Sequence, residues 1–335
     1  MSDVSDLLDA AVAGGRVSLA RLLTLAERGG PEGAEVARLT HRLAGRAVTV
    51  GITGAPGSGK STLTGALCGV VRAAGERIAV LAIDPSSPFS GGAILGDRVR
   101  MSDHALDEGV FIRSMATRGH LGGLAVATPA AIRVLDATGF PTVIVETVGV
   151  GQVEVEIAGA ADTTVVVVNP GWGDAVQANK AGLMEIADVF VINKADRPGA
   201  AETRRDLEQM LMLSAAGSWV PPILETEATT GRGVAELWAT IAEHGRHLAV
   251  TGELGRRRVE RVGEEFRAAL LAGLLDRVEQ LAGPRRFAEL RDQVLRRQLD
   301  PLTAVVELLG DLPSGQTVTG TPDTSRRGRA GGGSC

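Results

Sequence analysis

The sequence contains no tyrosine, and aromatic residues make up only 3% of its 335 residues. Few aromatic rings and a formal net charge of −5 argue against nucleic-acid binding through base stacking and a basic surface. Cysteine is also scarce. Cys68 lies in an apolar helical stretch and Cys335 is the last residue, so no disulfide framework is expected. The sequence shows neither a run of about 18 apolar residues nor a signal peptide. These absences predict a cytoplasmic protein that binds neither membranes nor nucleic acid.

The chain nevertheless has the composition of a globular protein, with 44% hydrophobic and 22% charged residues. Residues 1–45 carry apolar residues at helical spacing and predict an N-terminal helical extension. Residues 46–250 alternate short apolar runs with helical segments. Runs that are apolar at successive positions are typical of strands buried on both faces of a parallel sheet. We therefore predict an α/β fold, a doubly wound and mostly parallel sheet, with strands near residues 47–54, 77–84, 110–115, 141–149, 163–169, 189–196 and 221–226.

Residues 251–312 are predicted to be helical and to form a dimerisation region. A long amphipathic helix is expected over residues 255–282, followed by two shorter helices near 284–299 and 301–310. Its apolar stripe, from Val259 to Leu281, is long for a helix lying on a domain already covered by its own helices. We expect it to pack against a second copy in a two-fold dimer; the alternative is packing on its own domain. Residues 313–335 are low in complexity and are predicted to be disordered.

The stretch GITGAPGSGKST follows a predicted strand and opens a predicted helix. It matches the phosphate-binding pattern G-x-x-x-x-G-K-[ST] in the structural context that this motif requires. Backbone N–H groups of such a loop wrap phosphates, and the helix N-terminus adds favourable partial charge. Lys60 is expected to reach the terminal phosphates and Ser61 to hold Mg²⁺. The residues expected to contact the nucleotide are Gly54, Ala55, Pro56, Gly57, Ser58, Gly59, Lys60, Ser61 and Thr62.

The stretch NKAD, residues 193–196, ends a later strand and indicates which base is bound. Asp196 can accept hydrogen bonds from the ring N–H and the exocyclic amine of guanine. Adenine has no such donor pair, so a carboxylate buried against it would lose about 1–3 kcal/mol. Lys194 is expected to lay its stem over the base, and Asn193 to tie the loop together. The next strand end offers a backbone N–H to the base from Glu227, Ala228 and Thr229. GTP is therefore favoured over ATP.

Acidic residues near the strand ends predict the magnesium site. Glu146 follows a buried strand, and Gly149 is placed to sense the terminal phosphate through its backbone N–H. Asp84 and Asp97 are two further candidates. Since Mg²⁺ takes one or two carboxylates and keeps several waters, some of these acids are expected to bind metal-bound waters instead. Asp84 has an alternative role as a turn or helix cap.

Two histidines and one glutamine are further candidates for metal-binding or catalytic roles. His244 and His247 stand three apart on a predicted helix, but no further metal ligands cluster with them, so we expect a solvated helix face. Gln152 resembles a water-positioning glutamine, although its spacing from Gly149 differs from that in Ras. No tyrosine or cysteine offers itself as a nucleophile.

The polar segment PGWGDAVQANKAG, residues 170–182, is longer than a strand-to-helix connection requires. Its glycines can act as hinges, and Gln177 and Lys180 can reach phosphate or ribose when the loop closes. Such a loop suits a nucleotide-driven switch. Trp172 would then offer apolar area to a partner. The alternative is a mobile loop with Trp172 tucked onto the sheet.

These motifs together resemble the MeaB/ArgK family of P-loop GTPases. The resemblance covers most of residues 46–250 and is weaker at both ends. The stretches that carry it are GITGAPGSGKST, AIDPSSPFSGGAILGDRVRM, RSMATRGHLGGLA, IVETVGVGQVEVEIAGAAD, PGWGDAVQANKAGLMEIADVFVINKADR and LDPLTAVVELL.

The resemblance implies a homodimeric GTPase that acts as a chaperone for an adenosylcobalamin-dependent acyl-CoA mutase, of the methylmalonyl-CoA mutase type. Such a protein would gate cofactor loading and protect or reactivate the mutase. The resemblance also places Asp84 and Asp97 in a first switch, Glu146 in a second and residues 171–182, with Lys180, in a third.

Other functions remain open from the sequence. A small-molecule kinase or a transport-associated ATPase would share the phosphate loop, but no second substrate motif is evident. A nickel-insertion GTPase would require a cluster of cysteine and histidine.

Overall fold

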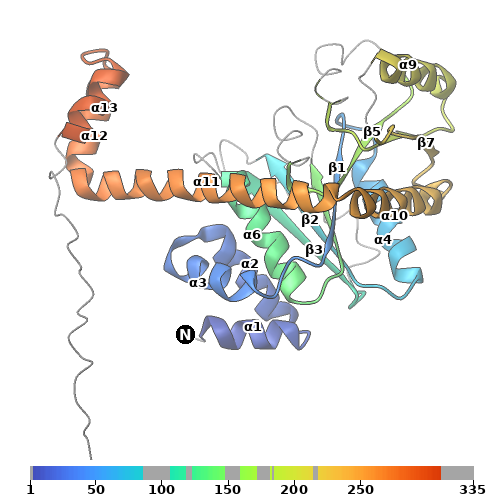
Figure 1. Ribbon diagram of the computed structural model, residues 1–335, viewed down its shortest axis with the longest axis horizontal. Helices are drawn as coiled ribbons and strands as arrows, with labels where there is room; N and C mark the ends of the chain where they lie inside the picture. The colour runs from blue at the N-terminus through green and yellow to red at the C-terminus, as the bar shows by residue number, and fades with distance from the viewer. Residues whose placement is uncertain are drawn as a thin grey trace, which may run out of the picture. The chain divides into compact units, whose positions relative to one another are not determined.

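A computed structural model describes residues 3–85, 106–117, 123–147, 159–171, 182, 185–213 and 218–310. Its centre is a seven-stranded sheet, ordered β3-β2-β4-β1-β5-β6-β7, in which all neighbouring strands are parallel (Figure 1). The predicted doubly wound sheet is confirmed, with each strand at its expected position. The strands are β1 (Val48–Thr53), β2 (Ile78–Pro85), β3 (Val110–Thr117), β4 (Thr142–Thr147), β5 (Thr163–Val168), β6 (Val189–Asn193) and β7 (Ile223–Thr226).

Helices cover both faces of the sheet, which explains why successive strand residues are apolar. In β5, Val165 and Val167 pack in the core shared with α4 (Lys60–Ala73) and α10 (Val234–Thr251). Val166 and Val168 face the opposite core, towards α9 (Ala200–Leu213). All six residues of β5 are buried. A strand with two buried faces therefore reads as a continuous apolar run.

Three helices precede the sheet, which confirms the predicted N-terminal helical extension. They are α1 (Val4–Val12), α2 (Arg16–Arg28) and α3 (Gly30–His41). Their apolar residues join those of α6 (Gly123–Ala137) in one core against β2, β3 and β4. Helix α2 ends at Gly29, whose φ of 71° is a conformation that favours glycine.

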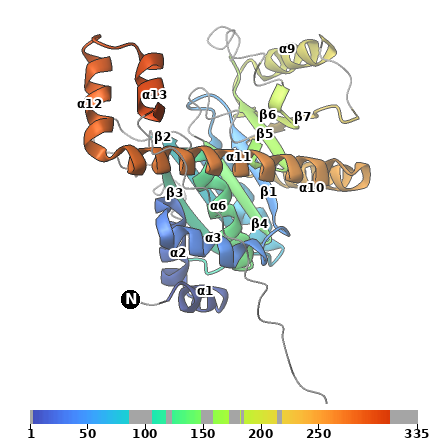
Figure 2. The same ribbon diagram turned by 60° about the vertical axis from the view of Figure 1, so that its left-hand side comes forward.

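The chain divides into two compact units, residues 1–269 and 270–335. The long helix α11 (Glu253–Ala282) contains this boundary, and α12 (Pro284–Leu295) and α13 (Pro301–Gly310) pack on each other in the second unit (Figure 2). The three predicted C-terminal helices are thus present. Within the described ranges, no helix is both long enough and apolar enough to cross a membrane. The tail, residues 313–335, lies outside the described residues.

Candidate nucleotide-binding site

The phosphate loop lies between the end of β1 and the start of α4, at the carboxyl edge of the sheet. Gly54 has a φ of 136°, and a Cβ at this position would lie 2.0 Å from the carbonyl oxygen of Val167. Gly59 has a φ of 93°, and its Cβ would lie 2.4 Å from Nδ2 of Asn193. Only glycine fits at either position. The two glycines of the motif are therefore required both by backbone conformation and by close packing on β5 and β6.

Lys60 begins α4 with its side chain buried inside the loop. Its Nζ donates to the carbonyl oxygens of Gly54 at 2.7 Å and Ala55 at 2.9 Å. The ammonium group and the N-terminus of the helix thus concentrate positive charge within the loop. Ser58 is also buried, whereas Pro56, Gly57 and Thr62 are exposed. An anion such as a phosphate matches this arrangement.

Ser61 and Glu146 lie together beneath the loop. The Ser61 hydroxyl donates to Oε1 of Glu146 at 2.6 Å, and both side chains are buried. Glu146 is held in β4, in register with Ile52 of β1 and Ala82 of β2. A hydroxyl beside a carboxylate is a donor set that suits Mg²⁺, which completes its shell with water and phosphate oxygens. Among the described residues, no three histidine, cysteine or acidic side chains gather into a metal site of protein ligands alone.

Cys68 lies on α4 and is fully buried. Burial, followed by the nearby charge of Glu146, raises the pKa of its thiol to about 12. The thiol therefore stays protonated at neutral pH and is not a nucleophile.

Asn193, at the end of β6, joins the phosphate loop to the loop after β7. Its Nδ2 donates to the carbonyl oxygen of Ser58 at 2.9 Å. Its Oδ1 accepts from Oγ1 of Thr226 at 3.1 Å and from the backbone N–H of Ala228 at 3.2 Å. One buried amide thus connects three segments that are far apart in the sequence. The tying role predicted for Asn193 agrees with these bonds.

Lys194 and Asp196 follow directly. Lys194 has a φ of 59°, and its Nζ donates to the carbonyl oxygen of Gly57 at 2.7 Å, which stretches its stem across the loop. Asp196 is exposed, and no described residue bonds its carboxylate, so both oxygens can accept from a ligand. The energetic argument for guanine therefore applies only once a base covers Asp196.

Glu227 is turned away from this edge. Its carboxylate binds Thr230 at 3.1 Å and also Arg232, within its own loop. Thr229 is exposed, and the N–H of Ala228 is already engaged by Asn193. The side chain of Glu227 therefore stabilises the conformation of its own loop.

Several predicted site residues cannot be placed in this geometry. Asp84 lies in β2, paired with Ala116 of β3, and only its backbone is described. Asp97, Gly149, Gln177 and Lys180 lie outside the described residues, as do Gln152 and Trp172.

The expectation of a solvated face for His244 is wrong. Its ring is fully buried against Trp219, with centroids 4.8 Å apart. Nδ1 lies 2.8 Å from Oγ1 of Thr163, and Nε2 lies 3.3 Å from Oδ1 of Asp188. Burial lowers the pKa of His244, which keeps the ring neutral near pH 7. The helical spacing of the two histidines did not reveal which face of α10 packs on the sheet.

The sequence did not predict an ionic cluster around two buried aspartates at the amino ends of strands β5 and β6, opposite the carboxyl ends that carry the phosphate loop. Arg258 and Arg261 of α11 contact the carboxylate of Asp162 at 2.7 and 3.0 Å, and Arg257 contacts Asp188 at 3.1 Å. Each aspartate stands directly before a buried strand, in the repeated pattern Ala-Asp. That pattern, together with the arginine-rich start of α11, was the feature of the sequence from which these ion pairs could have been predicted. The cluster fixes the beginning of α11 to the sheet.

Comparisons with known proteins identify the family of this chain. The family described as "Methylmalonyl Co-A mutase-associated GTPase MeaB" matches residues 19–282. A putative GTPase of Pyrococcus abyssi is 47% identical over 316 residues, covering 93% of this chain and 98% of that protein. The GTPase ArgK of Escherichia coli is 37% identical and covers 76% of this chain and 80% of its own length. A crystal structure described as a LAO/AO transport system kinase is 28% identical, with a TM-score of 0.68 over 92% of this chain and 96% of that one. With its phosphate loop, its NKAD segment and these relatives, the chain belongs to the MeaB family of P-loop GTPases.

Proposed function

We propose that this protein is a GTP-hydrolysing chaperone of an adenosylcobalamin-dependent acyl-CoA mutase of the methylmalonyl-CoA mutase type. It would gate cofactor loading and protect or reactivate the mutase. The observation that carries the nucleotide part is the Asn193 network, which brings the phosphate loop and the NKAD segment to one sheet edge. Membership of a family described as mutase-associated supports the partner.

The described residues fit GTP and Mg²⁺. Mg²⁺, when bound, neutralises phosphate charge, and Ser61 and Glu146 are the side chains that would hold it. Asp84 and Asp97 would bind the metal directly or through its waters. Lys60 would leave the loop carbonyls for the terminal phosphates. Lys180 would reach the nucleotide from the third switch, and Gly149 would sense the terminal phosphate.

Hydrolysis in such a site is positioning combined with charge stabilisation, without a covalent intermediate. Asp196 would accept two hydrogen bonds from guanine, with Lys194 stretched along the base. No observation favours the small-molecule kinase or the transport-associated ATPase over the GTPase.

The partner is tested by complex formation with a defined mutase. The purified protein is mixed with the adenosylcobalamin-dependent acyl-CoA mutase of the same organism, with GDP, a non-hydrolysable GTP analogue or the matching ATP analogue. We expect a complex in size-exclusion chromatography that depends on the guanine nucleotide. The proposal fails if the two proteins elute separately under every condition.

A further inference from the structure

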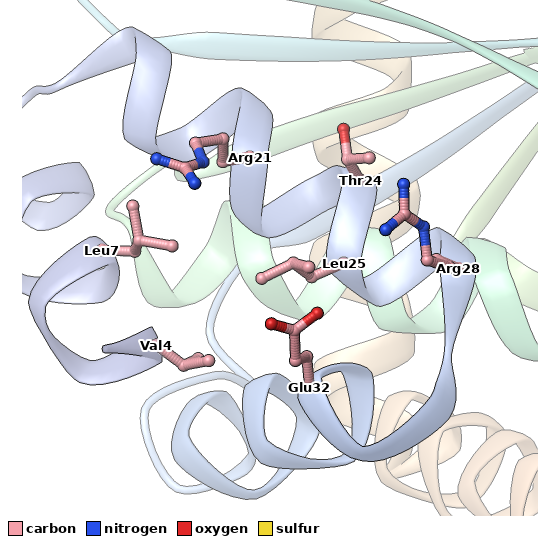
Figure 3. A pocket seen from close by; sticks show the side chains of 7 residues that line it. All are labelled: Val4, Leu7, Arg21, Thr24, Leu25, Arg28 and Glu32. Carbon is pink, nitrogen blue, oxygen red and sulfur yellow. The ribbon is translucent and has the colours of Figure 1, made fainter. Parts of the chain in front are cut away.

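The N-terminal extension contains a pocket of about 380 Å³. Its walls come from α1, α2 and α3, and none of its lining residues belongs to the nucleotide site (Figure 3). This volume falls in the range of about 300–1,000 Å³ that is typical of small-molecule sites. The lining residues are Val4, Leu7, Arg21, Thr24, Leu25, Arg28 and Glu32.

One part of the pocket is aliphatic. Val4 and Leu7 of α1 are buried at 9% and 7% exposure, and Leu25 of α2 is half-buried. Figure 3 shows their side chains extending into the same space from two helices. Because Val4 and Leu7 are already largely buried, Leu25 offers most of the aliphatic area that a short saturated chain can still cover, and covering it is favourable.

The cations of the pocket are Arg21 and Arg28, two turns apart on α2. Both are exposed, and no described carboxylate pairs with either of them. Elsewhere on the first unit, Arg38 pairs with Glu35 and Arg113 with Glu27. Two guanidinium groups beside an apolar wall can bind an oxyanion through charge-assisted hydrogen bonds.

Thr24 does not compete for this anion. Its hydroxyl donates to the carbonyl oxygen of Ala20 at 2.9 Å and accepts from Nη2 of Arg113 at 3.1 Å. Arg113 also contacts Glu27 at 3.0 Å and so fixes this face of α2 to β3. The wall of the pocket is thereby held in place by the sheet, and the two arginines remain its available donors.

Glu32 of α3 limits the charge of the ligand. With two arginines and one glutamate, the lining has a formal charge of +1. A single negative charge is matched by this lining, whereas a second negative charge would be repelled by Glu32.

We propose that this pocket binds a small aliphatic monocarboxylate, with its carboxylate on Arg21 and Arg28 and its chain against Val4, Leu7 and Leu25. The site is independent of the proposed mutase partner and of GTP.

The test is titration of the full-length protein with sodium hexanoate, followed by methyl and amide NMR shifts. Hexan-1-ol supplies the same chain without the charge, and adipate supplies a second carboxylate. We expect saturable hexanoate binding near the millimolar range, confined to α1, α2 and α3, with hexanol and adipate binding at least about tenfold more weakly.

Variants test which charged side chains bind the carboxylate. Arg21→Ala combined with Arg28→Ala should weaken hexanoate at least about tenfold, the effect of losing one charge-assisted hydrogen bond. Arg38→Ala, an exposed arginine of α3 outside the pocket, is the matched control and should leave binding unchanged. Glu32→Gln should reduce the difference in affinity between adipate and hexanoate. Because Arg21 and Arg28 are exposed and unpaired among the described residues, circular dichroism and the unfolding transition should stay as in the wild type.

The proposal is overturned if hexanoate produces no saturable shift in these helices or if hexanol binds as tightly. It is equally overturned if the double arginine variant binds hexanoate as the wild type does.

Discussion

At the scale of single residues, Asn193 joins three segments of the nucleotide site. Replacing it with alanine removes the bond to Ser58 and leaves the buried groups of Thr226 and Ala228 without their acceptor. We expect Asn193→Ala to lower the free energy of unfolding by about 1–3 kcal/mol and to weaken GTP binding.

Asn169→Ala is the matched control, since Asn169 directly follows the neighbouring strand β5 and its side chain makes one hydrogen bond among the described residues, to the adjacent Pro170. Denaturant titration and calorimetry compare the two variants. Equal losses in both would show that Asn193 does not join the loops in solution.

We propose that Asp196 reads the base. Asp196→Asn replaces one acceptor oxygen with a donor, so we expect GTP binding to weaken and xanthosine nucleotides to be admitted. Stability should stay within about 0.5 kcal/mol of the wild type, because the side chain is exposed. Calorimetric titration with GTP, XTP and ATP measures the specificity. Equal affinity of the wild type for ATP and GTP contradicts the assignment of guanine.

At the scale of elements, the start of α11 is fixed to β5 by buried charges. Arg258→Ala removes one of the two arginines that contact Asp162, which is itself 3% exposed. Complete loss of a buried pair costs about 3–5 kcal/mol, and since Arg261 remains we expect a loss of about 2 kcal/mol. Arg256→Ala, two residues away and 74% exposed in its pair with Glu253, should cost about 0–1 kcal/mol. Urea unfolding at neutral pH measures the stability of both variants. Equal stabilities would contradict the inference that these buried charges fix α11 to β5.

The same carboxylate makes stability depend on pH. Burial alone raises the pKa of Asp162, but the hydrogen bond from Arg258 and the charges of Arg261 and Arg258 outweigh it and hold the pKa below 3.8. A depressed pKa contributes stability above the unfolded value, and that contribution is lost as the pH falls through the folded value. We therefore expect wild-type stability to decline below about pH 4 more steeply than that of Asp162→Asn. Parallel acid unfolding curves would contradict this.

The sequence predicted the elements better than their contacts. Strand β5 has four successive valines because both of its faces are buried, and this local pattern can be recognised in the sequence alone. The phosphate loop is likewise one continuous motif. The contact of Arg261 with Asp162 joins residues 99 positions apart, and the burial of His244 depends on which side of α10 meets the sheet. Tertiary packing decides both, so periodicity could not reveal them.

At the scale of the whole molecule, α11 offers an apolar stripe to a partner. Within the first unit, Val259, Val262 and Phe266 are 74%, 53% and 68% exposed, so the described residues of the same chain do not cover them. We propose that residues 251–312 form a two-fold dimer through this stripe. Light scattering should give a dimer at micromolar concentration, and Phe266→Arg should give a monomer that still binds GTP. A monomeric wild type contradicts the proposed dimer.

We propose that the mutase accelerates GTP hydrolysis by this protein, and titrating the mutase into a hydrolysis assay measures this acceleration. We predict a basal rate below about 1 s⁻¹ that rises to a plateau as the mutase is added, with GTP and not with ATP. Lys180→Ala should bind GTP within about threefold of the wild type, a cost below about 0.7 kcal/mol, yet lose most of the acceleration. A hydrolysis rate that the mutase leaves unchanged would contradict the proposal that the mutase accelerates hydrolysis.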